Sequence, residues 1–229
     1  ILKSFKRDFC VTTKGGVRWS NIDNGERANT MLDNNPNYIS RCIENSLKRL
    51  DIDCIDRYLI HWPAKDLQLD PLLNTLLVHK EKGNIKSFGF CNVNYLLLDE
   101  IISKFSIDIT QNSFSLIDQT QKRILKKSIQ SKILSMGYGT LAQGLLTNKD
   151  FANVTFDKTD RRHRLPHFQE QFTFLMNSRI LKLRSLSRSL SIPLSAMAID
   201  WALQSGLVDE IIVGAKTVKQ LNENLNYGN

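Results

Sequence analysis

Two residues able to take part in catalysis each stand where a short apolar segment ends. Lys14 lies in the segment TTKGG, and His61 follows the apolar run YLI and precedes a tryptophan and a proline. Pro63 lacks a backbone N–H, so a buried strand before it must end near His61. Taken alone, each residue more often has a structural role, as a solvated lysine or a packed histidine. On neighbouring strands, a lysine can lower the pKa of a nearby phenol or stabilise an oxyanion, and a histidine can orient a carbonyl oxygen.

Other chemically distinctive residues end further apolar segments. Cys91 and Asn92 follow the segment IKSFGF, and Gln111, Tyr138 and Lys216 end three later segments. In a parallel sheet the carboxyl ends of the strands lie at one edge, where ligand sites are built. This shared position indicates a site more strongly than any single residue does.

Strands and helices must alternate to place these residues at one edge. Apolar runs predict a strand at about 8–16, a strand that leads to His61, and further strands at about 85–90, 107–111, 132–139 and 210–216. Helical spacing and cap residues predict helices at about 35–51, 70–82, 95–105, 120–130, 171–190, 194–205 and 217–226. A longer polar segment, 146–169, interrupts this order. The sequence therefore predicts six strand–helix units in an α/β protein with a parallel sheet.

Two parallel architectures are compatible with this order. A doubly wound sheet can have six strands, but the chain lacks the G-x-G-x-x-G turn after the first strand that marks most nucleotide-binding sheets of this kind. A β/α barrel has eight units and an active site at the carboxyl ends of its strands. The distribution of unusual residues favours the barrel.

Composition limits the class of protein. The formal net charge is +8, but the 31 Lys and Arg residues are dispersed, which favours a solvated basic surface over nucleic-acid binding. A basic chain also favours a phosphorylated cofactor. The spacing of the cysteines predicts neither a disulfide framework nor a zinc site. Without a membrane-length apolar run or a signal peptide, we expect a cytoplasmic protein with no membrane partner. The cysteines are Cys10, Cys42, Cys54 and Cys91.

The chain resembles the aldo-keto reductase family from about residue 8 to about residue 225. The resemblance rests on six segments in the order typical of the family: TTKGG, IDCIDRYLIHWP, GNIKSFGFCNVN, QNSFSLID, YGTLAQGLLT and GAKTVKQLNENL. It implies a (β/α)8 TIM barrel that reduces an aldehyde or ketone, a small-molecule substrate, with NAD(P)H. The segments YGTLAQGLLT and DRRHRLPHFQEQF are most similar to the bacterial and plant-type branch, which also contains the potassium-channel β-subunits.

The resemblance assigns roles at the ends of the first four predicted strands. It makes Lys14 and His61 active-site residues, with His61 holding the substrate carbonyl and Trp62 lining the pocket. It also implies that Asn92 and Gln111 bond to the nicotinamide carboxamide. Cys91 stands where the family commonly has serine, and a thiol is the weaker hydrogen-bond donor.

The resemblance assigns the rest of the cofactor site to the last two units. Tyr138 would stack on the nicotinamide ring. Lys216 can pair with a 2′-phosphate, which favours NADP(H) over NAD(H). An ordinary strand end followed by a first helical turn is the structural alternative for this last segment. The residues matching the pyrophosphate loop are Gly139, Thr140, Leu141, Gln143 and Gly144, and those matching the adenosine end are Gly214, Ala215, Lys216, Gln220, Glu223 and Asn224.

Two members of the family's catalytic group, an aspartate and a tyrosine acid, have no counterpart in this chain. They belong to the second unit of the barrel, before the strand with Lys14, and Asp56 and Tyr58 lie in a later strand. The chain also begins with Ile1 rather than Met. We therefore expect residues 1–229 to be a single barrel domain lacking the first two units, a fragment of a complete reductase. An inactive remnant and a nucleotide-binding regulatory protein without turnover remain alternatives.

The polar segment 146–169 contains two histidines but no recognisable substrate motif. We expect His163 and His167 to be surface residues of a long loop rather than metal ligands, because no third ligand is evident.

Overall fold

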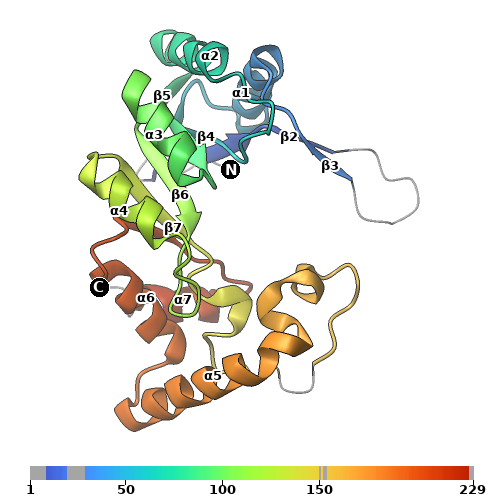
Figure 1. The fold of residues 1–229 in the computed structure, drawn as a ribbon, viewed down its shortest axis with the longest axis vertical. Helices are drawn as coiled ribbons and strands as arrows, with labels where there is room; N and C mark the ends of the chain where they lie inside the picture. The colour runs from blue at the N-terminus through green and yellow to red at the C-terminus, as the bar shows by residue number, and fades with distance from the viewer. Residues whose placement is uncertain (1–8, 20–28, 150, 152–153, 227–229) are drawn as a thin grey trace. The chain divides into compact units, whose positions relative to one another are not determined.

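The computed structural model describes residues 9–19, 29–149, 151 and 154–226. Within this part, six strands form one sheet with parallel pairing and alternate with helices (Figure 1). In hydrogen-bond order they are β1 (Thr12–Gly15), β4 (Ile55–Ile60), β5 (Ile85–Cys91), β6 (Ile109–Ser113), β7 (Leu134–Tyr138) and β8 (Glu210–Ile212). The six strands confirm the predicted α/β barrel class with about six units.

Seven α-helices are found in the described residues: α1 (Pro36–Leu50), α2 (Leu69–Glu81), α3 (Tyr95–Lys104), α4 (Lys122–Gln130), α5 (Glu170–Leu190), α6 (Leu194–Gln204) and α7 (Val218–Asn226). Each lies within about two residues of its predicted range. None of the described helices is long and apolar enough to cross a membrane.

The chain divides into two compact units. The first comprises Ile1–Asn112 and Arg123–Ser135, and the second comprises Ser113–Lys122 and Met136–Asn229. Strands β6 and β7 contribute residues to both units. The ends of β1, β4 and β5 thus belong to the first unit, and the ends of β7 and β8 belong to the second.

The core of the first unit lies between the strands and helices α1 and α2, which pack against each other (Figure 1). Helix α1 begins where the sequence predicts, because the Asn35 side chain accepts a hydrogen bond from Asn37 N over 3.0 Å and Pro36 occupies the first turn. Apolar residues of both helices and of β4 and β5 are fully buried there; examples are Ile39, Ile43, Leu72, Leu76, Ile60 and Phe90.

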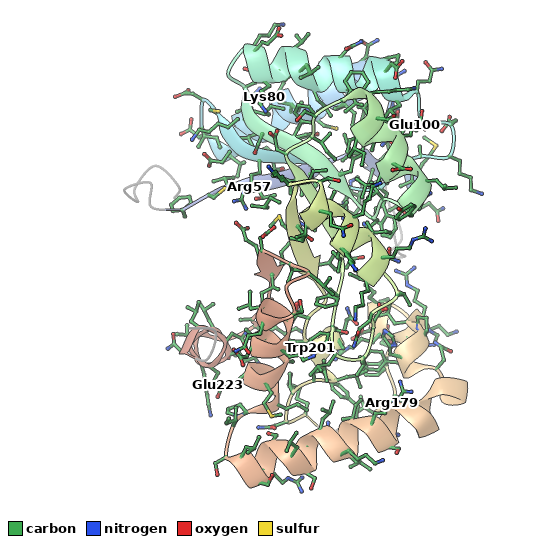
Figure 2. The ribbon with its side chains drawn as sticks, turned by 60° about the vertical axis from the view of Figure 1, so that its left-hand side comes forward. Arg57, Lys80, Glu100, Arg179, Trp201 and Glu223 are labelled. Atoms are coloured by element: carbon green, nitrogen blue, oxygen red, sulfur yellow. The ribbon has the colours of Figure 1, made fainter. Side chains whose placement is uncertain are left out.

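An ion pair attaches the end of α2 to the strand ends opposite the candidate site. Lys80, labelled in Figure 2, contacts both carboxylate oxygens of Asp108 over 3.0 and 2.9 Å. Asp108 also accepts a hydrogen bond from Phe88 N over 3.0 Å. These contacts fix α2, β5 and the start of β6 together at the amino ends of the strands.

The second unit packs α6 beside the β7–β8 pair. Strand β7 pairs with β8 in parallel, with Tyr138 opposite Ile212. Trp201 of α6, labelled in Figure 2, stacks on Phe114 with ring centroids 5.0 Å apart. A smaller apolar cluster forms around the turn after β7; its buried members are Ala142, Leu145, Leu146, Ile180 and Ala198.

Three details differ from the sequence predictions. A short antiparallel hairpin, β2 (Val17–Trp19) with β3 (Thr30–Leu32), follows β1 and is not predicted. Strand β6 extends to Ser113, so Gln111 lies inside the strand rather than at its end. Strand β8 ends at Ile212, so Lys216 lies in the segment between β8 and α7. The predicted first strand begins at residue 8, which lies outside the described residues.

Candidate functional site

The ends of β1 and β4 bring the backbones of Lys14 and His61 close together. The two strands pair in parallel, with Lys14 opposite Leu59 and Gly15 opposite Ile60. The next residue, His61, donates its backbone N–H to Gly15 O over 2.8 Å. The sequence predicts these residues on neighbouring strands of one sheet, and the register confirms that adjacency.

Cys91, the last residue of β5, is electrostatically linked to Lys14. Burial raises the pKa of the Cys91 thiol to about 12, and the positive charge of Lys14 opposes that rise. The thiol, which is 1% exposed, therefore stays protonated at neutral pH. It can act only as a weak hydrogen-bond donor beside Lys14.

Asn92 connects three strand ends. Its backbone N–H donates to Gln111 O over 2.9 Å, and its side-chain Nδ2 donates to His61 O over 3.0 Å. Its backbone is in the left-handed region, with φ 57°, which asparagine tolerates better than most residues. Gln111 lies opposite Cys91 in the register and is buried. The two amides assigned to the nicotinamide carboxamide thus lie on adjacent strands.

Tyr58 and Asp56 have structural positions, in agreement with the prediction that they do not replace the missing acid and aspartate. The Tyr58 side chain is fully buried, and burial raises the pKa of its phenol. A Cβ added to Gly15 would overlap its hydroxyl, so β1 needs glycine there. Asp56 accepts from Val11 N over 3.0 Å and pairs with Lys86 over 2.6 Å, which fixes the start of β1.

A cavity of about 630 Å³ opens beside these strand ends. Trp62, which is 40% exposed, and Asn92 contribute to its wall, but neither Lys14 nor His61 does. Lys104, another lining residue, pairs with Glu100 and Asp70 over 3.2 and 3.6 Å. The cavity therefore adjoins the candidate catalytic pair without containing it. The rest of the wall comes from the segment after His61, from the first turn of α2, and from Asn94 and α3.

In the second unit, the turn after Tyr138 has the backbone expected of an anion-binding loop. Four of its residues have positive φ: Gly139 at 72°, Ala142 at 46°, Gln143 at 53° and Gly144 at 101°. Such conformations let consecutive N–H groups point to one side. The Thr140 hydroxyl is buried and has no hydrogen-bond partner among the described residues. Positive φ at the non-glycine Ala142 is a strained conformation of the kind that accumulates at functional sites.

The segment assigned to the adenosine end is exposed and internally ordered. Lys216 N donates to the Gln220 side chain over 2.8 Å, and Gln220 N donates to Thr217 Oγ1 over 3.2 Å. Among the described residues, apart from its two chain neighbours, no group lies within 4 Å of the place that a Cβ on Gly214 would occupy. Space is therefore available beside Gly214, and the Lys216 side chain faces solvent.

The polar segment after the turn folds onto an aromatic cluster. The ring of Phe151 lies beside Gly144 and contacts those of Phe156 and Phe168. The Arg162 guanidinium lies 4.3 Å from the centre of the Phe156 ring and forms an ion pair with Asp160. Hydrogen bonds from Arg162 lower the Asp160 pKa to about 2. The segment predicted as a long polar loop contains short helices at Arg161–Arg164 and Pro166–Phe168, which the sequence analysis does not predict.

Two buried asparagines near the strand ends of the first unit are missed by the sequence analysis. Asn34 bonds to the segment that follows His61, and Asn112 bonds to Val93 O over 3.1 Å. Asn112 lies in the segment QNSFSLID, but no role is assigned to it there, and Asn34 lies in none of the six segments. The run DNN before Pro36 indicates only a helix start, so no sequence signal identifies Asn34.

Comparison with known proteins identifies the family. The model of the "Aldo/keto reductase family" matches residues 1–229. The "Aldo-keto reductase yakc [NADP(+)]" of Schizosaccharomyces pombe is 28% identical over 225 residues, which are 96% of this chain and 64% of the relative. The "NADH-specific methylglyoxal reductase" of Escherichia coli is 27% identical over 237 residues, covering 98% of this chain and 71% of the relative.

A solved structure agrees with the fold. The "glycerol dehydrogenase AKR11B4" from Gluconobacter oxydans superimposes with a TM-score of 0.88 at 26% identity, covering 99% of this chain and 69% of that one. The chain spans 64% of the length of the fission-yeast relative.

Proposed function

Because the chain belongs to the aldo/keto reductase family, we propose that it is the larger part of an NAD(P)H-dependent reductase that converts an aldehyde or ketone to an alcohol. The observation that carries the proposal is the pairing of β1 with β4, which sets Lys14 beside the strand that ends just before His61. We also propose that residues 1–229 belong to a single barrel domain and that its substrate is a small carbonyl compound.

Lys14 and His61 have distinct roles in this proposal. The Lys14 ammonium favours negative charge close to it, so it stabilises the oxyanion that develops on the carbonyl oxygen and lowers the pKa of a neighbouring phenol. The His61 imidazole holds the carbonyl oxygen by a hydrogen bond. The tyrosine that donates the proton in this family is not assigned to any residue of this chain, since Tyr58 is buried in the core. Trp62, which lines the cavity and is 40% exposed, would contact the body of the substrate.

The cofactor is assigned residue by residue. Asn92 and Gln111 would bond to the carboxamide, with Cys91 as a weak additional donor, and Tyr138 would stack on the ring. The pyrophosphate would be held by Gly139, Thr140, Leu141, Gln143 and Gly144, and the adenosine end by Gly214, Ala215, Lys216, Gln220, Glu223 and Asn224. When bound, the nicotinamide supplies the hydride.

Three observations support the fit of this chain to a dinucleotide. The turn after β7 has the positive φ values that orient N–H groups toward a phosphate, and the buried Thr140 hydroxyl has no protein partner among the described residues. Open space surrounds Gly214, as close approach of a ligand requires. An exposed lysine, Lys216, favours a 2′-phosphate and therefore NADP(H). The relatives carry names of both kinds, one with NADP(+) and one with NADH, so cofactor choice has to be measured.

The test uses the product of the complete gene. NADPH oxidation with an aromatic aldehyde and with methylglyoxal should be measurable, and His61→Ala and Lys14→Met should each lower kcat/KM by about two or more orders of magnitude. Near-normal turnover in either variant would remove that residue from the proposed mechanism. Tight NADPH binding without turnover would instead favour a nucleotide-binding regulatory protein, and loss of both functions would favour an inactive remnant.

A further inference from the structure

Three asparagine side chains of the first unit bond to backbone carbonyl groups at neighbouring strand ends. The donor–acceptor pairs are Asn34 with Trp62 (3.2 Å), Asn92 with His61 (3.0 Å) and Asn112 with Val93 (3.1 Å). Each contact joins chain segments at least 19 residues apart in sequence. Strand-end turns are therefore connected to one another by side chains as well as by the sheet ladder.

Asn34 holds the segment after His61 at two points. Its Nδ2 donates to Trp62 O, and its Oδ1 accepts from Ala64 N over 2.6 Å. The two bonds lie on either side of Pro63, which has no N–H of its own to fix the segment. Asn34 is only 6% exposed, so these bonds are shielded from competing water.

The same side chain contacts the turn after Lys14. A Cβ on Gly16 would lie 2.7 Å from Asn34 Nδ2, and Gly16 has φ 96°, a conformation that favours glycine. The preceding residue, Asp33, donates its N–H to Gly16 O over 3.0 Å. Asn34 thus lies between the turn that follows Lys14 and the turn that follows His61.

We infer that Asn34 is a positioning residue that fixes the His61 segment relative to the Lys14 turn. It does not act on the substrate itself; it sets the geometry of the two residues proposed to do so. Its catalytic consequence rests on the proposed function, whereas its effect on His61 does not. A displacement of about 1 Å at a catalytic group can lower the rate by about a hundredfold.

Kinetics of the complete gene product give the first test. Asn34→Ala should lower kcat by 10- to 100-fold while the Kd for NADPH changes less than threefold, because the assigned cofactor residues keep their own contacts. The matched control is Asn84→Ala, which removes another partly buried asparagine at the opposite end of β5, where it bonds to His79 over 2.9 Å. This control should lose thermal stability but keep kcat within twofold. Equal kcat values in the two variants would overturn the inference.

Histidine NMR gives a second test that needs no activity. The His61 ring resonances, assigned with His61→Ala, should shift in Asn34→Ala and stay unchanged in Asn84→Ala, which should shift His79 instead. Unchanged His61 resonances in Asn34→Ala overturn the inference. If the wild-type protein reduces no carbonyl, the proposed function fails, and the NMR result still decides the role of Asn34.

Asn34→Asp covers the case in which the alanine variant does not fold. Aspartate keeps the acceptor for Ala64 N and loses the donor to Trp62 O. We expect a folded protein with a smaller, roughly tenfold loss of kcat and a smaller shift of the His61 resonances. If Asn34→Asp has the kcat and the His61 resonances of the wild type, the contact with Trp62 does not position His61.

Discussion

At the scale of single residues, we expect Cys91 to be a departure from the family pattern. The serine usual at this position offers an O–H donor, whereas a thiol donates weakly. We predict that Cys91→Ser tightens NADPH binding by about 2- to 10-fold, the equivalent of one ordinary hydrogen bond. Fluorescence titration of the complete gene product measures this change.

Cys91→Ser should also lower the free energy of unfolding of the protein without bound cofactor. Cys91 is 1% exposed, so a serine hydroxyl without its cofactor partner would be buried and unpaired, at a cost of about 1 kcal/mol or more. Urea unfolding with and without NADPH separates the two effects. Cys42→Ser, in α1, serves as the control and should leave cofactor affinity unchanged. An unchanged Kd in Cys91→Ser would show that residue 91 does not bond to the cofactor.

At the scale of secondary-structure elements, His79 joins α1, α2 and the start of β5. Its Nε2 lies 2.7 Å from Ser40 Oγ, and its Nδ1 lies 2.9 Å from Asn84 Nδ2. An amide NH₂ can only donate, so Nδ1 accepts and Nε2 carries the proton of a neutral ring. Burial lowers the His79 pKa below its usual 6.5, with Lys82 acting in the same direction and Glu44 opposing it.

This lowered pKa predicts a loss of stability in mild acid. Below pH 6.5 the unfolded state binds a proton that the folded state resists, so the stabilisation present above pH 6.5 is lost as the pH falls. The free energy of unfolding should decrease between pH 6.5 and 5.5 by at most about 1.4 kcal/mol per pH unit from this one group. Urea unfolding at pH 7.5, 6.5 and 5.5 measures the slope.

His79→Gln is the comparison variant for this prediction. It should be less stable at pH 7.5 but show a flatter dependence on pH. Carboxylates with lowered pKa values, such as Asp160 at about 2, titrate below this range and do not contribute. A slope as steep in the variant as in the wild type would assign the acid sensitivity to another group.

The elements also show what sequence patterns can and cannot predict. Helix α1 is located correctly because Asn35 and Pro36 give a local cap signal. The ends of β6 and β8 are misplaced because a strand ends where its neighbour stops pairing, and that is not a local property. The β2–β3 hairpin has no predicted counterpart, because each of its strands is only three residues long and gives no period that could be recognised.

At the scale of the whole molecule, the order of six strand–helix units is predictable from periodicity, but the contacts of Asn34 are not. Periodicity places Lys14 and His61 at strand ends, and a parallel sheet makes these ends neighbours. Asn34 is separated from Trp62 and Ala64 by 28 and 30 positions in the sequence, and no spacing rule encodes their approach. Long-range hydrogen bonds are therefore the part of the candidate site that required the structure.

The net charge of +8 is a property of the whole chain with a measurable effect on cofactor choice. A 2′-phosphate adds about 1.5 to 2 negative charges to NADPH relative to NADH at neutral pH. The dispersed positive charges of the chain attract this 2′-phosphate over a long range. Salt screens that attraction, because the Debye length falls from about 10 Å at 0.1 M to about 3 Å at 1 M salt. Raising NaCl from 0.05 to 0.5 M should therefore weaken NADPH binding several-fold more than NADH binding.

Lys216→Gln separates the local from the dispersed contribution to this effect. Lys216 is exposed beside α7, so its loss should reduce the difference in salt dependence between the two cofactors without abolishing it. If Lys216→Gln abolishes the difference in salt dependence between NADPH and NADH, Lys216 alone determines cofactor choice. That result would contradict a contribution from the dispersed positive charges. Equal salt dependence of NADPH and NADH in the wild type would mean that neither the net charge nor Lys216 recognises the 2′-phosphate, and the preference for NADP(H) would fail with it.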